Sequence, residues 1–252
     1  MCLQMVLHPL YRIDLAPTRH DVLLDTNSDS PRPGSSRPNR TPCPADFPPS
    51  PDLPAVRSSE LVPGTPVLDA LCALVTLQHD RRDARADADG GLVRLADQDR
   101  SRWHKDEIDS GLAVLRAIAP TVGFAEELRL QALIAAFHAT AATAADTDWA
   151  AVVRVYRRLE LLTGSPVVRL NRAVAVAELS GPLEGLRVLQ AAADQLPGHH
   201  RVHVVRAELL RREGQISAAR DAYKTAIALC PDGPELRYLR GQLAAVESID
   251  FG

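Results

Sequence analysis

Apolar residues recur at helical spacing along most of the chain, from Val67 to about Val246. Between Leu68 and Leu77, leucine or valine returns every three or four positions, which predicts a first helix over 67–87 with one apolar side and a charged C-terminal end. The same spacing predicts a series of further helices joined by short connections. Their expected ranges are about 104–119, 125–145, 148–162, 166–179, 182–194, 199–213, 215–229 and 234–247. Because short connections make successive helices antiparallel, the pattern predicts an all-α fold of helical hairpins.

Glycine, proline and small polar residues mark the expected ends of these helices. Ser165 precedes Pro166, Gly181 precedes Pro182, Gly214 follows a helical segment, and Asp232 lies just before Pro234 and Glu235. Serine and aspartate are preferred helix N-caps, proline suits the first helical turn, and glycine commonly ends a helix. Gly90 and Gly91 lie between two short arms with partial alternation, in 86–98. That segment predicts a small hairpin or an irregular turn.

The last predicted hairpin has the residue spacing of a tetratricopeptide repeat (TPR). Small, turn, small, aromatic, small and proline positions follow one another at intervals of 7, 5, 4, 3 and 5 residues. They are Ala207, Gly214, Ala219, Tyr223, Ala226 and Pro231. Small residues let two helices approach closely, and an aromatic side chain fills the space beside them. The usual large residues of the first helix are replaced by His203, Arg206 and Leu210, so the repeat is degenerate.

The same pattern returns upstream with a period of 33 or 34 residues. Tyr223, Leu189 and Tyr156 keep this spacing. So do two further sets, Ala219 with Gly185 and Val152, and Ala226 with Ala192 and Leu159. We therefore predict a helical repeat domain over 67–250, a short right-handed solenoid with repeats at about 125–162, 166–194 and 199–231 and a capping helix at 234–247. The alternative is a plain helical bundle with a coincidental period.

The N-terminal segment 1–66 differs sharply from the rest of the chain. It holds 13 of the 19 prolines and few spaced apolar residues. Such a segment buries too little apolar surface to offset the entropy lost on ordering, so we expect a disordered tail.

Composition narrows the classes of function. A formal charge of −3 and 4% aromatic residues disfavour direct nucleic-acid binding. The sequence has no long apolar run and no cleavable leader pattern, and we expect a cytoplasmic protein without a membrane partner. No phosphate-binding, dinucleotide-binding or hydrolase motif occurs, so neither an enzyme nor a cofactor is expected. His199, His200 and His203 could place two imidazoles on one helical face, but no carboxylate or cysteine at fitting spacing completes a metal site.

Two short segments are candidate partner-binding sites. The first joins the predicted turn to the next helix and combines acids, arginines and an indole, side chains that often anchor interfaces. Its residues are Asp97, Asp99, Arg100, Arg102 and Trp103. The second contains Asp148 and Trp149. In the alternative interpretation the acids cap helices, Trp103 packs in the core, and the arginines pair locally.

The strings DQDRSRW at Asp97–Trp103, ADTDW at Ala145–Trp149 and SPVVRLNRAVAVA at Ser165–Ala177 carry a family resemblance, which covers about residues 68–247. The chain resembles the C-terminal TPR-like extension of extracytoplasmic-function (ECF) RNA polymerase sigma factors. The resemblance implies a module that regulates transcription initiation by contacting sigma-factor domains or RNA polymerase. We add Asn171, in the third string, to the candidate partner-binding residues.

The segment ahead of this region departs from that family. There, two domains that bind promoter DNA and polymerase precede the extension, whereas here 1–66 shows no helix-turn-helix pattern. We therefore expect no promoter recognition by this chain alone. The residues leave open a truncated or frameshifted sigma factor, an autonomous regulator, and a generic TPR-like scaffold unrelated to transcription.

Overall fold

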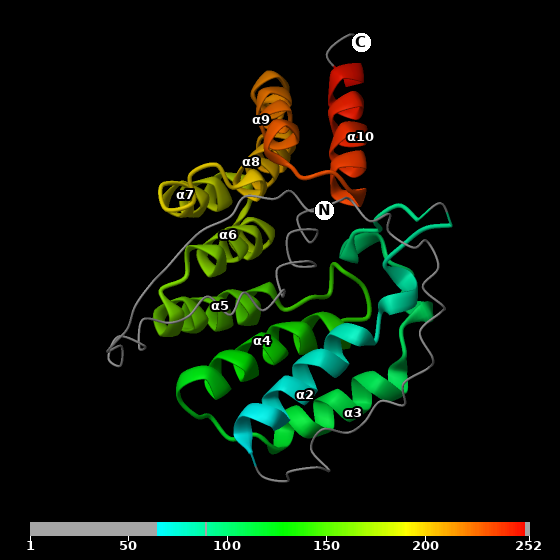
Figure 1. Cartoon of the computed structure of the whole chain (residues 1–252), viewed down its shortest axis with the longest axis vertical. Helices are drawn as coiled ribbons and strands as arrows, with labels where there is room; N and C mark the ends of the chain where they lie inside the picture. The colour runs from blue at the N-terminus through cyan, green and yellow to red at the C-terminus, as the bar shows by residue number, and fades with distance from the viewer. Residues whose placement is uncertain (1–64, 89, 250–252) are drawn as a thin grey trace, which may run out of the picture. The chain divides into compact units, whose positions relative to one another are not determined.

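The computed structural model describes residues 65–88 and 90–249 (Figure 1). Most of the predicted disordered segment 1–66 lies outside these residues. The described part of the chain contains nine α-helices and no β-strand. They are α2 (Pro66–His79), α3 (Lys105–Ala117), α4 (Gly123–Thr140), α5 (Trp149–Thr163), α6 (Pro166–Ser180), α7 (Pro182–Ala193), α8 (His200–Arg212), α9 (Ile216–Leu229) and α10 (Pro234–Ile249). The predicted all-α fold is confirmed.

Helices α2, α3 and α4 pack together around the first hydrophobic core. Fully buried Ala70 and Ala73 lie on α2, and Leu128 and Ala132 lie on α4. Gly111 allows α3 to approach α2, since a Cβ there would lie 2.8 Å from Cγ of Leu77. This three-helix group forms the N-terminal part of the described fold.

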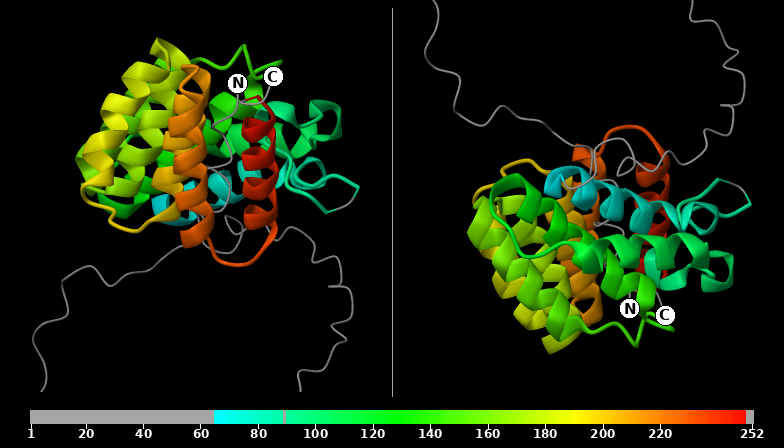
Figure 2. Two further views of the ribbon diagram at one scale, coloured as in Figure 1. Left: turned by 90° about the horizontal axis from the view of Figure 1, so that it is seen from above. Right: turned by 90° about the horizontal axis from the view of Figure 1, so that it is seen from below.

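From α4 onward, each helix packs against the next along the chain, through α10. Figure 1 shows α4, α5, α6 and α8 following one another, and both views in Figure 2 show α9 (orange) and α10 (red) as separate neighbouring helices. The first helix of each hairpin carries small and branched side chains, such as Ala173, Val174 and Ala177 of α6, which are buried. The apolar side chains of these helices contact both the preceding and the following helix. Stacked hairpins bury their apolar surface in this way.

The three sets of residues that defined the period all lie inside this core. Tyr156, Leu189 and Tyr223 are buried at equivalent places in α5, α7 and α9. The small-residue positions are buried as well, among them Ala219 and Ala226. Gly185 shows why one such position is a glycine, because a Cβ there would lie 2.6 Å from Cβ of Ala177 and 2.9 Å from the Ala173 carbonyl oxygen. The period therefore reflects the packing of hairpins.

The helix boundaries agree with the prediction to within one to two residues, with two exceptions. The predicted helix 125–145 ends at Thr140, and the first helix stops at His79, before its charged end. The glycine predictions hold: Gly181 and Gly214 both have positive φ, at 94° and 74°. Ser165 occupies the N-cap position of α6, but its side chain makes no capping hydrogen bond.

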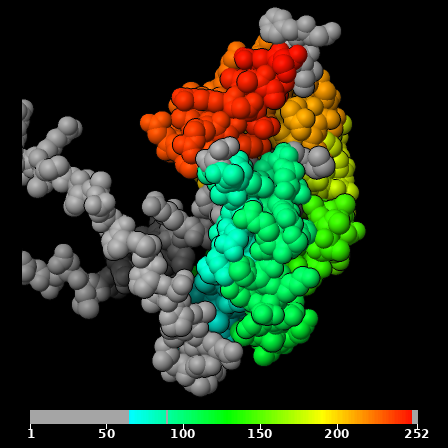
Figure 3. All heavy atoms as spheres, turned by 90° about the vertical axis from the view of Figure 1, so that its right-hand side faces the viewer, coloured from blue at the N-terminus to red at the C-terminus, as the bar shows by residue number. Residues whose placement is uncertain are grey.

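The segment 86–98, predicted as a small hairpin or an irregular turn, is an irregular turn with one isolated antiparallel bridge, Ala86 to Leu92. The 3₁₀ turn η3 (Leu95–Asp97) lies within it, and η2 (Arg82–Ala84) and η4 (Arg100–Arg102) lie on either side. In this segment the Arg94 guanidinium interacts electrostatically with the Tyr238 side chain of α10, and Figure 3 shows the green-cyan atoms of this region close to those of α10 in red. Within the described residues, no helix combines the length and apolar composition that a membrane span requires.

Candidate functional site

The candidate site is built on the irregular segment 80–104, between α2 and α3. Backbone hydrogen bonds hold it in place: the His104 N–H donates to the Asp80 carbonyl at 2.8 Å, and the Val93 N–H donates to the Arg85 carbonyl at 2.9 Å. On its surface, Arg82 pairs with Glu107 of α3 at 2.8 Å, and His104 pairs with Asp83 at 2.7 Å. These contacts fix the irregular segment against the start of α3.

Arg100 and Trp103 connect this segment to the C-terminal end of α4. The Arg100 guanidinium lies over the Trp103 ring, 4.3 Å from its centroid, and donates to the carbonyl oxygens of His138 at 2.8 Å and Ala141 at 2.7 Å. These carbonyls lie in the last turn of α4 and just beyond it, where helical acceptors have no partner within the helix. Arg100 therefore acts as a C-terminal cap, held in position by the indole.

Asp80 and His138 lie buried beneath this pair. A cavity of about 20 Å³ is lined by Asp80, Trp103 and His138, a size that suits one water molecule. Burial raises the pKa of Asp80 to about 6, although Arg81 and Arg85 lower it. Burial lowers the pKa of His138 to about 3, helped by the charges of Arg81 and Arg100, so the imidazole is neutral. Polar groups this deeply buried are costly unless water or another partner satisfies them.

A larger pocket of about 510 Å³ opens beside the same pair. Trp103, Ile108 and Leu112 give it apolar walls, and Arg100 and Lys105 give it positive charge, which Asp109 offsets in part. The end of α4 and the loop after it, at Ala141 and Ala142, also line the pocket. The volume is that of a ligand pocket, and its lining can take an apolar side chain together with a carboxylate.

The structure brings together only some of the predicted contact residues. Arg100 and Trp103 line the pocket, but Trp103 is only 5% exposed and is mainly a core residue. Asp99 caps η4 by accepting from the Ser101 N–H at 2.9 Å, and Asp97 pairs with Arg94. Arg102 is exposed. Much of this segment therefore agrees with the alternative interpretation, in which the acids cap helices and the indole is buried. The pocket is the part of its surface that a partner can reach.

The second group of predicted residues serves α5 and α6. Asp148 caps α5 by accepting from the Ala151 N–H at 2.8 Å. Trp149 begins α5, and its ring meets the His138 ring edge-on at 5.4 Å between centroids. Asn171 is only 4% exposed in α6, so its predicted role in direct contact with a partner is corrected to a buried one. Its amide oxygen has no hydrogen-bond partner among the residues that the structure describes.

A cluster of potential metal ligands was missed from the sequence. His200 does not combine with His203, as the helical spacing suggested; it lies beside Cys230 and Glu235. The latter residues are 30 and 35 positions further along the chain, so no local spacing could have indicated them. Only the return of the chain from α9 into α10 brings them to the start of α8.

Comparisons with known proteins agree with this architecture. Residues 207–245 match the TPR repeat family, over the end of α8, α9 and most of α10. Residues 53–119 match a family described as "Family of unknown function (DUF6596)". The matched range contains the segment 80–104, part of which lines the pocket. Fold and match together define a helical-repeat protein with a TPR repeat, a kind of repeat that mediates protein–protein interaction.

One curated relative is similar over most of the chain. It is "Uncharacterized protein R00370" of Rhizobium meliloti (strain 1021), 40% identical over 199 residues. The alignment covers 75% of this chain and 45% of the relative, so the chain spans about half the length of the protein it matches. No solved structure matches the chain.

Proposed function

We propose that this protein is a regulatory protein-interaction module of transcription initiation, and that it contacts sigma-factor domains or RNA polymerase through the pocket beside Trp103. The observation that carries the proposal is this pocket, formed by the same DQDRSRW segment that resembles the sigma-factor extension. The TPR repeat supports the coarser part, a role in binding proteins. The transcriptional part rests on the sequence resemblance.

The lining of the pocket indicates what kind of partner segment it accepts. An apolar side chain would pack against half-buried Leu112 and the small accessible parts of Trp103 and Ile108, and an adjacent carboxylate would pair with exposed Lys105. Aromatic and aliphatic walls provide most of the affinity, and the rim charge provides orientation and a faster encounter. We therefore expect an acidic segment with one or two exposed apolar residues as the partner.

The chain offers a matched pair of variants for the test, because Lys105 and Lys224 are its only lysines. Both are exposed, but Lys224 lies on α9 and does not line the pocket. Purified chain is titrated against purified RNA polymerase core, sigma factor and holoenzyme, and affinity is measured by surface plasmon resonance. Lys105→Glu is expected to weaken binding about ten-fold or more, whereas Lys224→Glu leaves it within about two-fold.

The outcomes separate the two candidate functions. Binding that is lost in Lys105→Glu alone supports the proposal. Equal losses in both variants would move the binding surface away from the pocket. If neither polymerase nor sigma factor binds, while another protein does so through Lys105, the chain is a TPR-like scaffold unrelated to transcription.

A further inference from the structure

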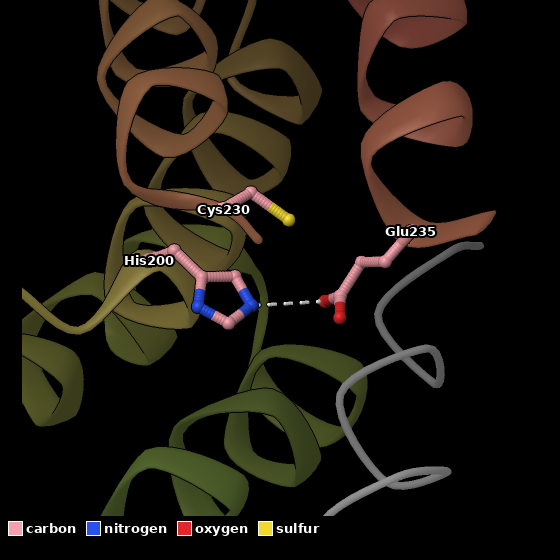
Figure 4. Close-up of side chains that lie close together, drawn as sticks. All are labelled: His200, Cys230 and Glu235. Carbon is pink, nitrogen blue, oxygen red and sulfur yellow. Dashed lines mark ion pairs between the residues drawn. The ribbon is translucent and has the colours of Figure 1, made fainter. Parts of the chain in front are cut away.

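Three side chains of different chemistry converge where the chain turns from α9 into α10. His200 is the first residue of α8, Cys230 directly follows α9, and Glu235 lies in the first turn of α10. Figure 4 shows the imidazole, the thiol and the carboxylate facing a common space between these elements. Their potential ligand atoms all lie within 4.8 Å of one another.

The separations are close to those of a metal site. Zinc binds imidazole nitrogen and carboxylate oxygen at about 2.0–2.2 Å and thiolate sulfur at about 2.3 Å, which puts ligands of a tetrahedral site about 3.3–3.8 Å apart. Nε2 of His200 already lies 3.3 Å from Oε1 of Glu235. Small side-chain adjustments would therefore place all three ligands around one ion.

The cluster is shielded from solvent and only partly satisfied by the protein. The side chains of His200 and Glu235 are 17% and 23% exposed, and Cys230 is half-buried. Among the described residues, buried Nε2 of His200 has no hydrogen bond of good geometry, although it lies 3.3 Å from Oε1 of Glu235. A buried ring nitrogen in this state is the kind of group that a metal ion satisfies.

Neighbouring residues orient the cluster from outside. Nη2 of Arg201 lies 3.4 Å from Oε2 of Glu235, the oxygen that does not face His200. The His199 ring stacks on the His200 ring, with centroids 5.5 Å apart and planes 4° apart. Contacts of this kind fix the orientation of ligating side chains in metalloproteins. The positive charge of Arg201 opposes a cation, but thiolate and carboxylate together offset the charge of a divalent ion.

We propose that His200, Cys230 and Glu235 bind a zinc-type divalent cation, with water as the fourth ligand. The mixed nitrogen, sulfur and oxygen set is one that suits Zn²⁺. When the metal binds, the Cys230 thiol loses its proton to solvent and its sulfur forms a bond to the metal. The oxidation state of the metal does not change. The ion would join the start of α8 to the start of α10 and so brace the C-terminal end of the repeat array.

Cobalt(II) is the probe, because it replaces zinc in such sites and a Co²⁺–thiolate bond gives a near-ultraviolet charge-transfer band. Full-length protein is titrated with Co²⁺ and then with Zn²⁺ as competitor. We expect a band of one-thiolate intensity that Zn²⁺ abolishes. Cys230→Ser should remove it, and His200→Ala and Glu235→Gln should each weaken Co²⁺ binding more than about ten-fold.

The other cysteines provide the control. A variant with Cys2, Cys43 and Cys72 changed to serine and Cys230 retained should keep the full band. Circular dichroism of each variant checks folding, and Zn²⁺ should raise the Tm of the wild type but not of Cys230→Ser. A band that persists in Cys230→Ser, or no band in the folded wild type, would overturn the site. Neither outcome bears on the binding of a protein partner at the Trp103 pocket.

Discussion

Buried carboxylates paired with arginine join neighbouring helices of the array. Glu126 of α4 is 2% exposed and binds Arg129 at 2.7 Å and Arg158 of α5 at 3.1 Å. Hydrogen bonds from Arg129 lower the pKa of Glu126 to about 2, against the effect of burial. Glu178 of α6 similarly binds Arg212 of α8 at 2.8 Å. Burial of Glu126 costs desolvation, and the loss of Arg129 and Arg158 would leave its carboxylate buried and unpaired.

His138 is expected to make stability depend on pH. Its native pKa is about 3, and its ordinary value is 6.5, so below pH 6.5 the unfolded state takes up the proton and the native state does not. As the pH is lowered from 6.5 to about 3, the free energy of unfolding therefore falls by up to about 1.4 kcal/mol per pH unit. His138→Leu should remove this loss.

Urea unfolding of both proteins at about pH 7 and about pH 5 measures the effect, and we expect the wild type to lose about 1–2 kcal/mol relative to the variant. The wild type is compared with His138→Leu at each pH because Asp80, which both proteins contain, changes the stability in the direction opposite to His138. Its native pKa of about 6 exceeds its ordinary value of 3.8, so it adds stability as the pH falls between these values. A difference between the proteins that stays constant with pH would contradict the assignment.

Single polar residues were the hardest feature to predict from the sequence. The charges around Glu126 and Arg212 form a local pattern that is typical of solvated helix faces and does not indicate the partners of these two residues. Their actual partners lie 32 to 34 residues away. Local spacing carries no information about such partners. Asp148 was predictable as a cap, because the hydrogen bond that defines a cap is formed within three residues.

At the scale of helices, close approach at glycine is the feature that sets the packing of α6 against α7. Gly185→Ala would bring a methyl group within 3 Å of Ala177 and the Ala173 carbonyl. Since backbone must shift to accommodate it, we expect a loss of about 1–3 kcal/mol in the free energy of unfolding.

Gly241 provides the control on α10, because a Cβ there meets nothing within 4 Å. Gly241→Ala should stabilise the protein by up to about 1 kcal/mol through helix propensity. Both effects are read from urea unfolding followed by far-ultraviolet circular dichroism. If Gly185→Ala were as stable as Gly241→Ala, the close packing of α6 and α7 would be contradicted.

Helices were predictable because each is defined by apolar spacing and by glycine or proline at its ends. The segment 80–104 was not, because its fold depends on distant groups: Arg100 reaches carbonyl oxygens 38 and 41 residues away. The sequence therefore indicated which residues matter there, including Trp103, but left open whether they bind a partner or pack in the core. In the structure they form the wall of a pocket and the cap of α4.

In the whole molecule, the stacked helices α4 to α9 and the segment 80–104 have separate roles. The helices α4 to α9 pack one after another around successive hydrophobic clusters, and the segment before α3 helps to line a pocket at the end of α4. The proposed metal site lies elsewhere, between α8 and α10. Partner binding and metal binding are therefore expected to respond to different variants, Lys105→Glu in one case and Cys230→Ser in the other.

Hydrogen–deuterium exchange of the full chain with and without RNA polymerase holoenzyme locates a bound partner without assuming where it binds. We expect binding in the pocket beside Trp103 to slow exchange in residues 100–112 and 139–142 and to leave α9 unchanged. Slowed exchange confined to α8, α9 and α10, or no change at saturating polymerase, would show that polymerase does not bind in this pocket.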